Sequence, residues 1–109
     1  MALRHATSGV VMDVRPLGDR LIVEKTCALF KSEDLSVLRV VLGAGQTLHE
    51  HKLPGEITIH CIEGSLEVVC GGDVQILNAG EMLYLARHTL HAVKAIQDAS
   101  ALVTISVKH

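Results

Sequence analysis

Histidines at two places in the chain have the residue type and spacing to bind a metal ion. The first group is His49 and His51, and the second is His88 and His91. On a helix, residues two apart diverge by about 200°. On a strand they share a face, so both imidazoles of the first group can approach one ion while Glu50 faces away. Two surface or hydrogen-bonded histidines are the alternative interpretation of this group.

The second group could supply a third imidazole. His91 lies in the apolar run 90–95, on the same face as Val93 and Ala95 if that run is a strand. Such a strand carries one histidine among apolar neighbours that keep a cavity dry. His88 precedes the run, and we expect it at the rim of the sheet. The two groups together predict a metal centre with ligands from separate parts of the chain.

Short runs rich in β-branched and aliphatic residues follow residue 20, and glycine-rich or Pro-Gly turns separate them. This spacing predicts one all-β domain, a sandwich or small barrel of about nine to ten strands, rather than βαβ units. We expect an irregular N-terminal arm over residues 1–18 and a barrel over residues 19–109. The runs span residues 21–23, 27–30, 35–42, 56–62, 66–70, 74–77, 82–86, 90–95 and 101–107.

Composition excludes several classes of protein. The 109 residues are 49% hydrophobic and 20% charged, which suits one folded domain and excludes a disordered chain. The apolar runs are too short to span a bilayer. The formal net charge is -2 and no basic cluster is present, so we expect neither nucleic acid nor a membrane as a partner.

The cysteine pattern favours a reducing compartment. Three cysteines with no CxxC spacing indicate neither a disulfide framework nor a cysteine-rich zinc site. The apolar stretch near the N-terminus is too short for a signal peptide, so we expect a cytoplasmic protein. Plain packing or exposure explains Cys27, Cys61 and Cys70, with a redox or ligand role as the alternative.

Two stretches resemble the motifs of the cupin family. The first motif is glycine, five residues, HxH, three or four residues and glutamate, and the second is glycine, five residues, PxG, two residues and histidine. The resemblance covers about residues 35–107. It implies a double-stranded β-helix, or jelly-roll barrel, and a metal held by the motif residues. The matching positions are Gly43, His49, His51 and Glu56 in the first motif, and Gly80 and His91 in the second.

This sequence departs from the family pattern in its second motif. Ala86 and His88 replace the motif's proline and glycine, so that turn is built differently. Ala95 stands where the family has asparagine.

A further departure leaves the fourth ligand open. In the family, a glycine follows the motif glutamate after six residues. Here seven residues separate Glu56 from the corresponding glycine, Gly64. If the extra residue lies in the loop 52–55, the ligand position falls on Ile57, which cannot bind a metal. If it forms a bulge inside the strand, Glu56 keeps the role. His60 is a competitor, or a cross-strand or dimer-interface residue, but four strand residues span about 13 Å, so one ion cannot take both side chains.

The donor set suits one divalent transition metal, Fe, Mn, Ni or Zn. The resemblance implies a small-molecule pocket, and the family includes dioxygenases, isomerases, decarboxylases and binding-only proteins. Because Phe30 and Tyr84 are the chain's aromatic residues, we expect a small, largely aliphatic ligand. Arg87 or Lys52 could hold an anionic group of that ligand, or could be solvated. Tyr84 is either a packed residue or a catalytic acid.

Self-association is a further expectation. The mean hydropathy is +0.36, and the run 35–42 is mainly apolar on both faces. A homodimer that buries one sheet face would explain this pattern. Two alternatives to a metal-dependent enzyme stay open, namely a ligand-binding or sensor protein without turnover, and a structural dimeric barrel whose histidines are vestigial.

Overall fold

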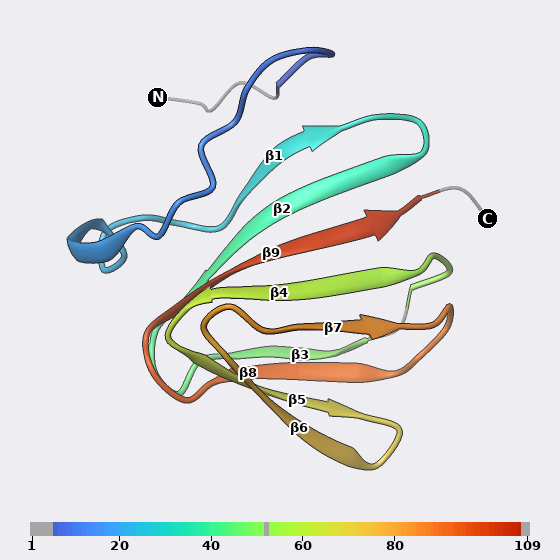
Figure 1. Cartoon of the computed structure of the whole chain (residues 1–109). Helices are drawn as coiled ribbons and strands as arrows, with labels where there is room; N and C mark the ends of the chain where they lie inside the picture. Colours follow the sequence, from blue (N-terminus) through green and yellow to red (C-terminus); the bar gives the residue numbers. More distant parts are fainter. Residues whose placement is uncertain (1–5, 52, 108–109) are drawn as a thin grey trace.

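The computed structural model describes residues 6–51 and 53–107, without the side chains of residues 49–51. In this part of the chain, nine antiparallel strands follow one short 3-10 helix (Figure 1). The strands are β1 Cys27–Lys31, β2 Leu35–Leu42, β3 Thr47–His51, β4 Ile57–Glu63, β5 Ser65–Cys70, β6 Asp73–Asn78, β7 Met82–Leu85, β8 His91–Ala95 and β9 Ala99–Ser106. The predicted all-β jelly-roll fold is confirmed.

Two sheets enclose the core. One has the strand order β1-β2-β9-β4-β7 and the other the order β3-β8-β5-β6. Alternation along the strands creates the buried faces, as in β4, where Ile57, Ile59 and Cys61 lie in the core and the residues between them face outward. Within the described ranges, no helix has the length and apolar character needed to cross a membrane.

The expected strand over residues 21–23 is wrong. These residues form a turn after the 3-10 helix η1 (Gly18–Arg20), with hydrogen bonds from Leu21 N to Gly18 O and from Val23 N to Arg20 O, both at 3.1 Å. Ile22 is 82% exposed. Three apolar residues indicate a strand only where a neighbouring strand is available, and here the backbone bonds locally instead.

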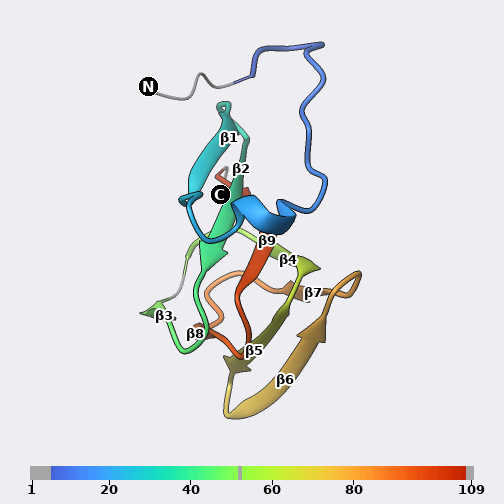
Figure 2. The same cartoon turned by 90° about the vertical axis from the view of Figure 1, so that its left-hand side faces the viewer.

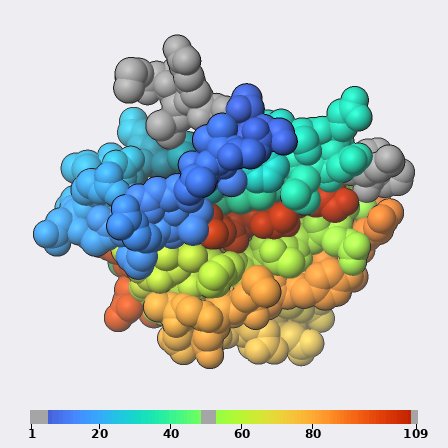
Figure 3. Space-filling model, turned by 45° about the horizontal axis from the view of Figure 1, so that its top comes forward, coloured from blue at the N-terminus to red at the C-terminus, as the bar shows by residue number. Residues whose placement is uncertain are grey.

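The N-terminal segment (residues 6–26) lies against the outer face of the five-stranded sheet. Arg39 of β2 donates from Nη2 to the carbonyl oxygen of Asp13 at 3.4 Å and is only 5% exposed, although it points away from the core. Figure 2 shows η1 beside β9, and Figure 3 shows the segment lying across β2. The segment therefore covers part of the outer face of β2, the strand whose residues 35–42 are mainly apolar on both faces. The homodimer expected from that pattern stays a prediction.

The connection from β4 to β5 requires glycine. Gly64 has φ +77°, and a Cβ there would lie 2.1 Å from the carbonyl oxygen of Asp98 and 2.8 Å from the Cα atom of Ala99. The register between β4 and β9 shifts by one residue between Cys61 and Glu63. One residue more on β4 than on β9 is a β-bulge, and it lies inside the strand between Glu56 and Gly64.

Candidate metal centre

His91 is the described histidine that faces the barrel interior. It begins β8, is 3% exposed, and shares its face with the buried Val93 and Ala95. Its Nδ1 atom lies 3.0 Å from the carbonyl oxygen of Thr89. Because a carbonyl only accepts, this contact is a hydrogen bond in which Nδ1–H donates to Thr89. A backbone carbonyl that fixes the tautomer in this way is typical of a metal-ligating histidine.

The pairing of β3 with β8 brings His51 opposite His91. Leu48 pairs with Val93, and continuing that register would place Glu50 opposite His91. A register shift between Leu48 and His51 makes His51 the cross-strand partner instead. The bulge therefore places His51, rather than Glu50, opposite His91.

The two other predicted histidine ligands belong to the side chains that the structure does not describe. Those of His49 and His51 are not described, so the convergence of the three imidazoles stays a prediction. Among the side chains that are described, no three histidine, cysteine, aspartate or glutamate residues could together hold a metal ion. A complete centre at His91 therefore depends on β3.

Cys70 is a neighbour of His91 that the sequence did not single out. In the order β3-β8-β5, His91 pairs with His51 on one side and with Cys70 on the other. Cys70 is half-buried and packs against the core on the same face as Leu66 and Val68. In the sequence, the alternation of residues 66, 68 and 70 indicates that Cys70 shares a face with Leu66 and Val68. Only the pairing of β5 with β8 shows that Cys70 lies beside His91.

Glu56 lies just before β4 and is exposed, whereas Ile57 is 3% exposed and belongs to the core. The hydroxyl of Tyr84 donates to the Glu56 carboxylate. This hydrogen bond raises the pKa of Tyr84, and desolvation adds to the effect. The extra residue after the motif glutamate forms a bulge inside β4, and this is the alternative in which Glu56 keeps the ligand role. The Glu56 carboxylate, however, accepts the hydrogen bond from Tyr84. Its role as fourth ligand stays a prediction.

Tyr84 is 58% exposed, so it is not the packed residue that we considered. His60 alternates with the buried Ile59 and Cys61, so it lies on the outer face of the sheet, where it pairs with Met82 and Leu102. It is therefore on the opposite side of the sheet from the barrel interior.

His88 lies in an exposed turn with φ +60°. Its backbone N–H donates to the carbonyl oxygen of Leu53 at 2.8 Å. The second cupin motif has glycine at this position, and glycine adopts this backbone conformation without strain. His88 therefore adopts a conformation here that the glycine of the motif would adopt without strain.

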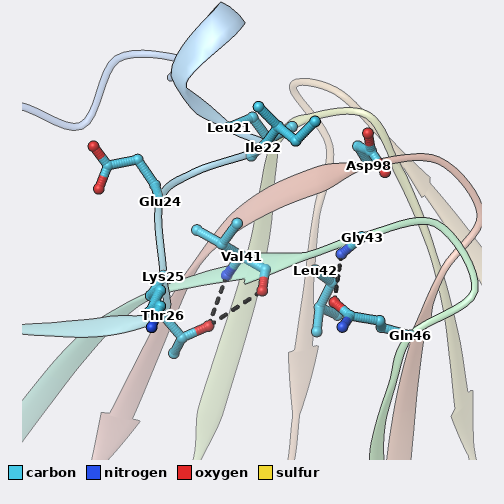
Figure 4. A pocket seen from close by; sticks show the side chains of 10 residues that line it. All are labelled: Leu21, Ile22, Glu24, Lys25, Thr26, Val41, Leu42, Gly43, Gln46 and Asp98. Atoms are coloured by element: carbon cyan, nitrogen blue, oxygen red, sulfur yellow. Dashed lines mark hydrogen bonds between the residues drawn. The ribbon is translucent and has the colours of Figure 1, made fainter.

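A cavity of about 380 Å³ lies at the other end of β3, between the N-terminal segment and the β2–β3 turn (Figure 4). Two of its polar side chains bond the backbone of the β2–β3 turn. Gln46 Oε1 accepts from Gly43 N at 2.6 Å, and Asp98 Oδ1 accepts from Ala44 N at 2.8 Å. These contacts hold the turn in place, and no histidine is among the described residues that line the cavity. We therefore assign the candidate centre to the His91 end of the barrel.

Comparison with known proteins supports the same fold. A profile of the family described as "Cupin domain" matches residues 38–108. No curated protein matches the chain in sequence.

Solved structures with the same architecture are distant in sequence. An RmlC-like cupin from Desulfovibrio desulfuricans is 28% identical, with a TM-score of 0.69 over 98% of this chain and 97% of that chain. A cupin superfamily protein from Desulfitobacterium hafniense is 16% identical, with a TM-score of 0.77 over 90% of this chain and 95% of that chain. Oxalate decarboxylase from Bacillus subtilis, which has Mn(II) centres, is 21% identical, with a TM-score of 0.65 over 69% of this chain and 22% of that chain.

Proposed function

This chain belongs to the cupin family, and on that premise we propose that it binds one divalent transition-metal ion inside the barrel through His49, His51 and His91. The observation that carries the proposal is the setting of His91, which is 3% exposed with Nδ1 bonded to the Thr89 carbonyl. The cross-strand register with His51 supports it, because directly paired residues of antiparallel strands share a face of the sheet.

The donor chemistry fits the ion. Three neutral imidazoles suit Fe(II), Mn(II), Ni(II) or Zn(II), and the Mn(II) centres of oxalate decarboxylase show that the fold accommodates such ions in one of its members. When bound, the metal supplies a Lewis acid with open positions. Glu56 stays the predicted fourth ligand, and the proposal rests on the three imidazoles because the Glu56 carboxylate is exposed and accepts from Tyr84.

We propose that the open positions take a small, largely aliphatic anion. Imidazole ligands are uncharged, so three of them leave the full charge of the ion in place to attract an anionic group. The buried face beside His91 consists of aliphatic side chains such as Val68 and Val93, which suit an aliphatic remainder. A metal-dependent reaction of the dioxygenase or isomerase type is compatible with this site.

Metal analysis tests the proposal. Protein purified without chelator should carry close to one transition-metal ion per chain, and His91→Ala should lose it. His60→Ala is the matched control because that histidine lies on the outer face of the same barrel. Equal metal content in His91→Ala and wild type would exclude the site, provided thermal unfolding shows that both variants fold. So would wild-type protein that stays empty after incubation with each of the four metals.

We also propose a cytoplasmic location. Cys27 and Cys70 are partly exposed and Cys61 is buried, and all three thiols are free. Accessible free thiols persist in a reducing compartment.

A further inference from the structure

We propose that the open edge of β6 pairs with the same edge of a second copy of this chain. The two β6 strands run antiparallel across a twofold axis, so that two four-stranded sheets become one continuous sheet. This interface is a strand edge, whereas the homodimer expected from the run 35–42 would bury a sheet face. Pairing of this kind needs no metal in the barrel.

The comparison of the four sheet edges points to β6. The edges are β1, β3, β6 and β7. Bulges, short length, a covering segment, lysine or proline keep an edge strand from pairing with another chain. Register shifts interrupt β1 and β3, the N–H of Ala6 bonds the carbonyl oxygen of Leu29 on β1 at 2.9 Å, and β7 has four residues.

β6 has none of these protective features over its length, which the structure describes throughout. Its six residues pair with β5 without a register shift, and its one charged residue is Asp73, at the start of the strand. Figures 1 and 2 both show β6 at the lower margin of the molecule, away from β1. This edge is therefore the one best suited to accept another strand.

The turn before β6 determines which main-chain groups face the open edge. Gly71 and Gly72 have φ values of +57° and +89°, as in a two-residue type I′ hairpin turn. Cys70 and Asp73 pair directly on either side of this turn, which makes them a hydrogen-bonded pair. Every second residue of β6, beginning with Asp73, therefore bonds β5, and the residues between them face the edge.

The end of β6 agrees with this alternation. The N–H of Asn78 donates to Glu81 Oε1 at 2.7 Å, and its carbonyl oxygen accepts from Glu81 N at 2.9 Å, so its main chain faces away from β5. Val74 and Ile76 have the same orientation, and no described residue outside the sheet bonds their main chains. Their side chains are 55% and 48% exposed on the outer face.

The register between the two copies follows from these groups. A twofold axis through Gln75 places Val74 opposite Ile76 of the second copy on both sides of the axis. Each such pair exchanges two main-chain hydrogen bonds and brings two exposed aliphatic side chains into contact. An axis through Ile76 would instead pair Val74 with Asn78, whose main chain already bonds within its own copy. We therefore assign the axis to Gln75.

Sedimentation equilibrium tests the interface. Wild-type protein should show a reversible monomer–dimer equilibrium, and Ile76→Lys should raise the dimer dissociation constant at least about tenfold, because lysine on an edge opposes strand pairing. Ile22→Lys is the matched control and should leave the constant unchanged, since Ile22 is 82% exposed in the turn after η1. Wild-type protein that stays monomeric up to about 1 mM, or a dimer that Ile76→Lys leaves unchanged, would overturn the proposal.

Disulfide cross-linking tests the register. Residues opposite each other in a pair without hydrogen bonds have Cα atoms about 4.5 Å apart, which a disulfide can span. Mild oxidation of Gln75→Cys should therefore link two copies through residue 75, identified by mass spectrometry so that links through Cys27 or Cys70 are told apart. Ile76→Cys is the control and should link at least about tenfold more slowly, because its two copies lie diagonally across the axis. Equal linking rates in the two variants would overturn the assigned register and with it the proposed interface.

Discussion

Glu63→Ala should release the N-terminal segment while the two sheets stay folded. The carboxylate of Glu63, at the end of β4, accepts from Leu17 N at 2.8 Å, from Gly18 N at 3.0 Å and from the hydroxyl of Ser100 in β9. Leu17 and Gly18 begin η1, where backbone N–H groups have no partner within the helix. Glu63 is therefore a direct connection between the segment and the barrel.

The cost follows from these three hydrogen bonds. A hydrogen bond to a charged group contributes about 1.5–3 kcal/mol when desolvated. The two N–H groups lie near the surface and can bond water in the variant, so we assign about 1 kcal/mol to each. The free energy needed to open the segment should then fall by about 2 kcal/mol, which raises the population of the open form about 30-fold. Ser100 is 1% exposed, and its unsatisfied hydroxyl should lower global stability by about a further 1 kcal/mol.

Limited trypsin digestion measures this opening, because Arg20 and Lys25 lie within the segment. Cleavage there should be about 30-fold faster in Glu63→Ala than in wild type, since proteolysis follows the population of the open form. Glu33→Ala, which removes an exposed carboxylate from the β1–β2 turn, is the control and should match wild type. Equal cleavage rates in Glu63→Ala and wild type would refute the assignment.

The same carboxylate makes stability depend on pH. Partial burial alone would raise the pKa of Glu63, but hydrogen bonds from Ser100, Leu17 and Gly18 hold it below its ordinary value. The folded state therefore gains stability above the unfolded pKa of about 4.3 and loses it as pH falls through the lower folded pKa. The difference in thermal midpoint between wild type and Glu63→Ala should be full at neutral pH and shrink below pH of about 4. A constant difference would contradict this assignment.

Two further substitutions test local features. His88→Gly should stabilise the protein by about 0.5–1 kcal/mol in chemical denaturation, because relief of left-handed strain outweighs the entropy of glycine. Destabilisation would mean that the imidazole makes a contact worth more than the strain. Glu56→Gln should lower the pKa of Tyr84 toward its ordinary value of about 10, and ultraviolet titration can follow this directly because the chain has one tyrosine and no tryptophan. An unchanged midpoint would show that the Glu56 contact does not perturb the phenol.

Much of the fold follows from local sequence signals. The run 35–42 is β2 to the residue, because its β-branched and aliphatic residues and the polar turn before it are both encoded locally. The failure at residues 21–23 has the opposite cause. An apolar triplet becomes a strand only when another strand lies beside it, and here Leu21 N and Val23 N bond the nearby carbonyl oxygens of Gly18 and Arg20 instead.

The candidate site is harder to predict than the strands, because pairing register decides it. Spacing identifies the histidine groups, but the bulge between Leu48 and His51 determines which residue faces His91. The pairing that brings Cys70 beside His91 joins residues far apart in sequence, and no local pattern encodes it. A slip of one residue sends every side chain of a strand to the other face, so spacing alone cannot fix a ligand set.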